Sequence, residues 1–214
     1  MRTVTILEML NDGKIDELKV KLRNEIYQES LKKKPDAKKR YMAMQKYFSY
    51  TKQSRECLQK PCKIIFEDKE YTSFTNSWSL ALTTEDTGEI ELFDSETKRY
   101  PDMAQIVSFE GIKRKVDFNK IFAEAASRGY RLGKNEINYK FKYLMKYDGT
   151  YYKIGLLDIT YRIIDDGKEA MVYHPYGERK PLTIKNDIGI CVIMPVKFDE
   201  EGPDDDIEVI EVVL

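Results

Sequence analysis

Residues 188–198 read IGICVIMPVKF, an apolar run that closes on Met194-Pro195 and then Lys197-Phe198. Proline cannot donate a hydrogen bond to a strand ladder, so Pro195 marks a strand end or a sheet edge. The segment could therefore simply finish a core strand. It could equally expose an apolar lip against which a partner docks. These residues leave both interpretations open, and the rest of the chain supplies their setting.

Composition places the chain among ordinary water-facing proteins of one large domain or two small ones. Its 214 residues are 42% hydrophobic and 34% charged. No apolar run approaches the roughly 18–20 residues of a membrane span, and MRTVTILEMLNDGK at the start has no secretory cleavage site. The cysteines Cys57, Cys62 and Cys191 follow no disulfide or zinc pattern. We therefore expect a cytoplasmic protein with reduced thiols and no membrane partner.

The net charge of −1 conceals an asymmetry along the chain. Residues 1–60 hold 15 Lys/Arg against 8 Asp/Glu, whereas residues 61–214 hold 21 against 29. A basic segment on an acidic body favours a polyanionic partner, although a solvated helix face would give the same counts. The expected organisation is a basic helical segment (1–60), a main domain (61–198), and an acidic linker with a terminal strand (199–214).

Helical periodicity appears in four places. A helix over 5–34 is predicted by apolar residues at helical spacing and stopped by Pro35, and a second runs from Asp36 to about residue 56. Asp117 is a good N-cap for a helix that ends at Gly129, with Val116 and Ile121 spaced as a hydrophobic staple. A fourth helix is predicted over 155–167.

Alternating and β-branched segments predict strands between these helices. They lie near 62–67, 70–76, 78–84, 88–93, 169–175 and 182–196, the last broken at Asn186-Asp187. Residues 137–154 form a hairpin around Asp148-Gly149, and 98–109 form a connector. Trp78 is expected in the core or half-buried. The terminal strand 207–214 needs a partner edge in its own sheet or another subunit. Segregated helices and antiparallel strands indicate an α+β fold.

The inventory of catalytic residues is thin. The one histidine, His174, precedes a Pro-Tyr-Gly turn and is expected to be a surface or satisfied loop residue. The sequence contains no glycine-rich phosphate loop. Asp204, Asp205 and Asp206 lack the loop that a metal site needs. We therefore expect no enzyme activity, no cofactor and no metal.

Three collinear stretches resemble the bacterial DNA polymerase III beta subunit, the sliding clamp. KIGLLDITYRIIDDGKEAMVYHPYGERKPLTIKNDIGICVIMPVKF (153–198) resembles its last part, which closes on a Met-Pro-hydrophobe-basic-hydrophobe end. KIIFEDKEYTSFTNSWSLALTTE (63–85) is similar to a clamp strand pair, and RYPDMAQIVSFEGIKRKVDFNKIFAEA (99–125) to its connector and next helix. The resemblance implies a clamp-like module, with helices on one side of a curved, mostly antiparallel sheet.

The chain also departs from that family. A clamp subunit holds three domain copies, and 214 residues have room for hardly more than one copy plus extras. The connector has Ser108-Phe109 in place of a terminal proline, and residues 5–56 are longer and more basic than the family's first helix. A ring would therefore need several subunits.

The resemblance implies a protein that holds its partners without chemistry. Duplex DNA would meet cations on the helices, namely Lys19, Lys21, Arg23, Lys38, Lys39, Arg40, Lys120, Arg128, Arg131 and Arg162. A peptide from a replication protein, or a host clamp, would dock on Val192, Ile193, Met194, Pro195 and Val196. The first hypothesis is a clamp-like DNA-associated protein, such as a replication processivity or accessory factor of a phage or mobile element. The alternative is a protein-protein interaction or assembly module that keeps the clamp fold without DNA binding. Its partner could be a second copy of the chain, which would give a homo-oligomer.

Overall fold

The computed structural model describes residue 6 and residues 9–50, 55–88, 90–94, 100–133, 141–175, 180–198 and 202–212. Parts of seven expected elements lie outside these residues. They are the start of the 5–34 helix, the end of the second helix, residue 89 of the 88–93 strand, residues 98–99 of the connector, 137–140 of the hairpin, 199–201 of the acidic linker and 213–214 of the last strand. No helix in the described part of the chain has both the length and the apolar character needed to cross a bilayer.

The described residues form four helices of eight or more residues and three short 3₁₀ turns, of which only the first turn joins two helices. They are α2 (Ile15–Ser30), α3 (Pro35–Tyr50), α4 (Phe118–Ser127) and α6 (Ile154–Tyr161), with η1 (Leu31–Lys33), η2 (Glu56–Leu58) and η3 (Met103–Gln105). The expected 5–34 helix is wrong in its continuity, because a turn at Asp12-Gly13 interrupts it, with Gly13 at φ +71°. The expected 155–167 helix ends early, at Tyr161.

Helix α4 begins and ends as its sequence predicts. The Asp117 carboxylate accepts the backbone N–H groups of Asn119 and Lys120, satisfying two donors that a helix start leaves unpaired. Val116 and Ile121 are both buried. Gly129 has φ +99° directly after the helix. This capping orients the helix that carries Lys120.

Two sheets contain all ten strands of the described residues. The strands are β1 (Cys62–Phe66), β2 (Lys69–Thr75), β3 (Ser79–Thr83), β4 (Ile112–Val116), β5 (Tyr143–Tyr147), β6 (Thr150–Lys153), β7 (Ala170–His174), β8 (Leu182–Lys185), β9 (Gly189–Ile193) and β10 (Glu208–Glu211). The seven-stranded sheet has the order β1-β2-β3-β9-β8-β7-β4, and each of its pairs is antiparallel. The smaller sheet has the order β10-β5-β6.

The terminal strand finds its partner within the chain. β10 pairs in parallel with β5, with Glu208 opposite Tyr143 and Ile210 opposite Met145. Ile210 is buried against the main core. The sequence had left open whether this strand pairs within its own chain or with another subunit. The pairing with β5 supplies hydrogen-bond partners along one edge of β10 from within the chain.

One strand prediction is wrong, and one strand was not predicted. Residues 90–94 have no regular structure, although the backbone N–H of Phe93 donates to the carbonyl of Pro61 at 2.7 Å. Gly88, at φ +58°, turns the chain just before them. Conversely, β4 forms where the sequence suggested only the lead-in to a helix.

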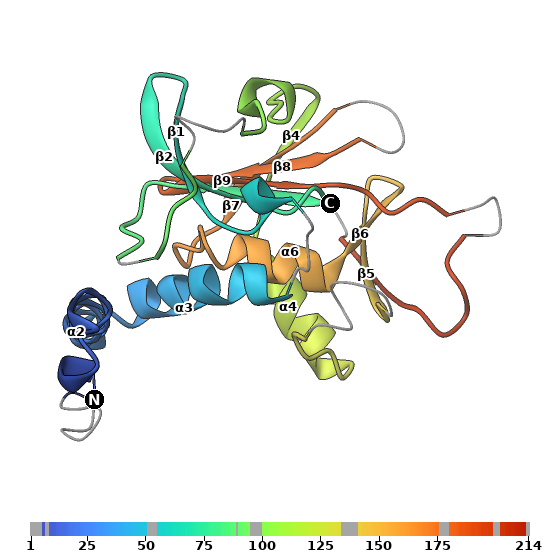
Figure 1. The fold of residues 1–214 in the computed structure, drawn as a ribbon. Helices are drawn as coiled ribbons and strands as arrows, with labels where there is room; N and C mark the ends of the chain where they lie inside the picture. Colours follow the sequence, from blue (N-terminus) through green and yellow to red (C-terminus); the bar gives the residue numbers. More distant parts are fainter. Residues whose placement is uncertain are drawn as a thin grey trace.

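The helices α3, α4 and α6 lie on one face of the seven-stranded sheet (Figure 1). The main hydrophobic core fills the space between them, and the rings of Phe118 on α4 and Tyr161 on α6 are 4.8 Å apart. Met44 and Tyr47 of α3 belong to the same core. The predicted α+β architecture, with helices on one side of an antiparallel sheet, is therefore confirmed.

The opposite face of the sheet has a smaller core of its own. Leu80, Leu82, Ile190 and Val192 point to this face, and Met103 of η3 packs against them. The segment 100–109 thus covers the face as the expected connector. Both faces of the central strands are therefore buried.

Candidate binding surfaces

The three helices of the core converge on a shallow cavity of about 380 Å³. Its walls come from the start of α3, the start of α4 and the end of α6, and it is lined by Asp36, Lys39, Arg40, Asn119, Phe122, Asp158, Tyr161, Arg162, Asp165 and Gly167. Three of the expected DNA-contacting cations meet here: Lys39 and Arg40 from α3, and Arg162 from the end of α6, more than a hundred residues later in the sequence. Three carboxylates line the same cavity, so its charge is balanced.

Arg162 is held in place by a buried acid. Both carboxylate oxygens of Asp158 accept from its guanidinium, and the side chain of Asp158 is only 1% exposed. The hydroxyl of Tyr130 donates to the same carboxylate at 3.0 Å. The hydrogen bond to Asp158 raises the pKa of Arg162. Arg162 is nevertheless half-exposed at the cavity, so it can present its outer edge to a ligand.

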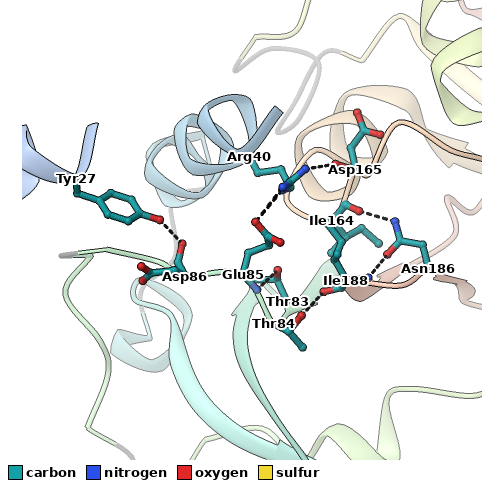
Figure 2. A network of polar contacts seen from close by, with 10 residues as sticks. All are labelled: Tyr27, Arg40, Thr83, Thr84, Glu85, Asp86, Ile164, Asp165, Asn186 and Ile188. Carbon is teal, nitrogen blue, oxygen red and sulfur yellow. Dashed lines mark hydrogen bonds and ion pairs between the residues drawn. The ribbon is translucent and has the colours of Figure 1, made fainter. Parts of the chain in front are cut away.

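Arg40 is a largely buried structural residue and is not part of an exposed basic face. Its Nε and Nη2 donate to Glu85 Oε2 at 3.3 and 2.9 Å, and its Nη1 donates to the carbonyl of Asp165 at 2.9 Å (Figure 2). The side chain is 13% exposed. Arg40 therefore ties α3 to the loops that follow β3 and α6, and we omit it from the proposed DNA-facing set.

The network around Arg40 continues into the sheet. The amide of Asn186 donates to the carbonyl of Ile164 and its oxygen accepts from the N–H of Ile188, while Thr84 donates to the carbonyl of Ile188 (Figure 2). Close by, the hydroxyl of Tyr27 on α2 donates to the carbonyl of Asp86. The Asn186-Asp187 turn that the sequence predicted is thus fixed from both sides.

The remaining expected DNA contacts form one group on α3 and α4 and a second group on α2. Lys38, Lys39 and Lys120 are exposed on α3 and α4, with Lys39 paired to Asp36 and Lys120 to Asp117. Farther along α4, Arg128 pairs with Glu124 and Glu208. Past its end, Arg131 donates to the carbonyls of Ala126 and Tyr130. These pairs are mostly exposed and therefore weak.

The α2 group is separate from this face. Lys19 pairs with Asp16 and Lys21 with Glu17, and Arg23 is exposed. Helix α2 lies beyond the start of α3, away from α4 (Figure 1). The structure therefore brings together the cations of α3, α4 and α6 but not those of α2.

The expected peptide-binding segment divides at the end of β9. Val192 and Ile193 are 1% and 0% exposed in the middle of the sheet, so they cannot contact a peptide. Met194 is 37% exposed, and Pro195 and Val196 are half-buried. The N–H of Val196 donates to the carbonyl of Tyr151. Only the last three residues remain available as a lip.

An exposed tryptophan extends this lip, against the expectation that it lies in the core. The Trp78 side chain is 61% exposed. Its carbonyl accepts the N–H of Met194 at 2.9 Å, which places the two residues side by side. The turn before β3, with Ser77 at φ +72°, directs Trp78 outward. Sequence reasoning had no means to detect this, because aromatic residues in strand-rich segments are usually buried. We call Trp78, Met194, Pro195 and Val196 the apolar lip.

His174 lies in the core and not in a surface loop. It is 1% exposed on β7, its Nδ1 is 3.4 Å from Asp148 Oδ2, and its Nε2 has no partner among the described atoms. The exposed Asp204, Asp205 and Asp206 do not gather with other ligands: within the described ranges, no cluster of three or more His, Cys, Asp or Glu side chains is placed to hold a metal ion.

No protein-family model matches the sequence, and no curated protein matches it significantly. Among solved structures, the chain is similar to the crystal structure of the DNA polymerase sliding clamp from Bacillus subtilis, with 13% sequence identity and a TM-score of 0.46. The similarity covers 75% of this chain and 62% of that chain, so it spans less than two thirds of the clamp.

Proposed function

We propose that this chain is a non-catalytic, clamp-like protein of the cytoplasm that associates with duplex DNA through its helical layer. The observation that carries the proposal is the convergence of α3, α4 and α6 on one face, where Lys39 and Arg162 line the same cavity and Lys120 follows its wall residue Asn119. The sequence resemblance extends the role to a processivity or accessory factor in replication, carried by a phage or mobile element.

The proposed contacts are exposed side chains that phosphates can recruit. Lys39 and Lys120 have side chains that are 78% and 81% exposed. Their ion pairs to Asp36 and Asp117 are each worth roughly 0–1 kcal/mol, because water screens both partners. A phosphate can therefore compete with the carboxylates. Lys38, Arg131 and Arg162 complete the set on this face.

The experiment compares two charge-reversing double variants by fluorescence anisotropy with a labelled duplex. The variant K39E/K120E should bind more weakly, and its dependence on log salt should flatten by about 2, since each lost phosphate contact removes about 0.9 from the slope. The variant K63E/K69E, on the distant β1–β2 hairpin, makes the same charge change and should bind as the parent does. Equal losses in both variants, or no duplex binding by the parent, would reject the proposal.

A second candidate function, capture of a peptide, is favoured by the apolar lip. An exposed Trp beside Met194 and Pro195 has the composition of an interface anchor, because Trp is enriched among residues that dominate binding. The occupant would be a short apolar peptide of a replication protein or of a host clamp, or a second copy of this chain.

The chain's single tryptophan reports directly on this candidate. Burial of Trp78 by an added apolar-aromatic peptide should shift its emission to the blue, and Met194→Glu should abolish the shift. Ile65→Ser removes a different exposed apolar side chain, on β1, and should leave the shift intact. A shift that survives Met194→Glu would place the peptide elsewhere.

A further inference from the structure

Edge strand β4 carries three consecutive exposed cations. Lys113, Arg114 and Lys115 are all exposed, and β4 pairs only with β7 among the described strands. No carboxylate in the described part of the chain lies within ion-pair distance of these three residues. This differs from the helical layer, where most cations already face an acid.

Strand geometry distributes these charges around the edge of the sheet. Residues paired across antiparallel strands point to the same face, and Arg114 is opposite Val172, a residue of the main core. Arg114 therefore lies on the helical side. Lys113 and Lys115 point to the opposite side, where Lys115 faces Met171 and Met171 faces Lys185 of β8.

The face that holds the lysines also holds two aromatic rings. Phe109 and Tyr173 are half-buried and meet edge to face, with centroids 5.0 Å apart. Lys185 lies 4.5 Å above the ring of Phe109, and Lys113 lies 5.4 Å from the ring of Tyr173. Among the described residues, Lys185 alone of these cations has a carboxylate partner, Glu67, and at 3.7 Å that pair is long. We call Lys113, Arg114, Lys115, Lys185, Phe109 and Tyr173 the β4 belt.

Charges that turn around an edge fit a flexible polyanion better than a rigid one. A duplex has a persistence length of about 50 nm and cannot bend around one sheet edge. A single strand can follow the curve, with phosphates at the cations and bases on the rings, the combination that single-strand-binding surfaces use. An acidic peptide would use the cations but would gain nothing specific from the two rings.

We propose that the β4 belt binds single-stranded nucleic acid. Phosphates contact Lys113, Arg114, Lys115 and Lys185, and a base stacks at Tyr173 in place of the Lys113 ammonium group. The site lies on a different part of the sheet from the helical layer and takes a different ligand. Its existence therefore does not depend on duplex binding.

The test measures anisotropy of labelled 20-mer dT and rU strands with the full chain. K113Q/R114Q/K115Q should weaken binding at least tenfold in low salt and flatten the salt slope by about 2, given roughly 0.7 per phosphate for single strands. K60Q/K63Q/K69Q, at the opposite end of the sheet order, removes the same charge and should bind normally. Circular dichroism and thermal melting establish that both variants fold.

Two further arms make the outcome decisive. Tyr173→Leu should weaken binding about tenfold at an unchanged salt slope, because stacking is not ionic. The dT and rU arms separate DNA from RNA as the source of the strand. Absence of binding to both oligonucleotides, equal binding by the K113Q/R114Q/K115Q variant, or displacement by poly-glutamate as efficient as by unlabelled strand would overturn the proposal. Loss of duplex binding in K39E/K120E alone would concern only the helical layer.

Discussion

The hydroxyl of Tyr47 on α3 lies 2.9 Å from the hydroxyl of Ser79 on β3, inside the main core. Thr160 of α6 places its own hydroxyl 2.9 Å from the same Ser79 oxygen. Three buried hydroxyls thus join two helices to the central sheet. Because all three have partners, they fix the position of the helices without leaving an unsatisfied polar group.

Tyr47→Phe should lower the free energy of unfolding by about 1–2 kcal/mol, because it deletes the hydroxyl and keeps the ring. Urea denaturation followed by circular dichroism measures the change. Tyr151→Phe is the matched control, since Tyr151 is half-buried and no side-chain hydrogen bond joins its hydroxyl to the described residues; its effect should stay within about 0.5 kcal/mol. Equal stability of the two variants would show that the Tyr47 bond contributes nothing.

Arg40→Met should destabilise the fold by about 2–3 kcal/mol, because Glu85 and the carbonyl of Asp165 lose a largely buried cation. Lys38→Met, two residues away and exposed, should change stability by less than about 0.5 kcal/mol. Thermal melting of both variants tests the contrast. A neutral Arg40→Met would return Arg40 to the set of surface cations.

Stability should fall as the pH rises above 10. Burial raises the pKa of Tyr161 and Tyr152, and burial together with Asp86 raises the pKa of Tyr27 to about 12. An unfolded tyrosine ionises near pH 10. The neutral form is therefore favoured in the fold, so its contribution is complete below pH 10 and is lost as the pH rises towards the folded values.

Urea unfolding at pH 9, 10.5 and 11.5 measures this loss. The free energy of unfolding of Tyr161→Phe should fall less steeply over that range than that of the parent. A free energy of unfolding that stays constant from pH 9 to 11.5 would contradict the assignment.

Gly111→Ala should destabilise the chain by about 2–4 kcal/mol. Gly111 has φ +87°, and an added Cβ would clash with the backbone carbonyl of His174, so β4 could not remain beside β7. Gly149→Ala is the comparison: Gly149 has φ +75° but no neighbour within 4 Å, so only the backbone strain of about 1 kcal/mol remains. Melting temperatures that fall equally would attribute both effects to φ alone.

The sequence predicted the elements whose residues carry a strong local signal. Asp117 and Gly129 bounded α4 correctly, and Asp148-Gly149, with φ +47° and +75°, formed the expected hairpin turn. The strand β4 gave no such signal. Its run of Lys113, Arg114 and Lys115 is exposed on both sides of an edge, so it lacks the alternation that identifies a half-buried strand.

Other errors came from turn chemistry and from tertiary contacts, neither of which periodicity contains. Helix α6 ends at Tyr161, and the carboxylates of Asp165 and Asp166 then accept the N–H groups of Gly167 and Lys168 in a turn. Of the expected surface sites, Arg40 entered the interior because Glu85 and Asp165 come to it from distant segments. Such pairings are decided by the assembled sheet and not by neighbouring residues.

The pairing of β3 with β9 has a kinetic consequence. Ser79 lies opposite Ile193, so the centre of the main sheet joins residues more than a hundred positions apart. Folds with such distant contacts form slowly, on the millisecond-to-second scale. While the chain emerges from the ribosome, β3 has an open apolar edge until residues 189–193 have been synthesised. We therefore expect nascent or truncated chains to depend on chaperones.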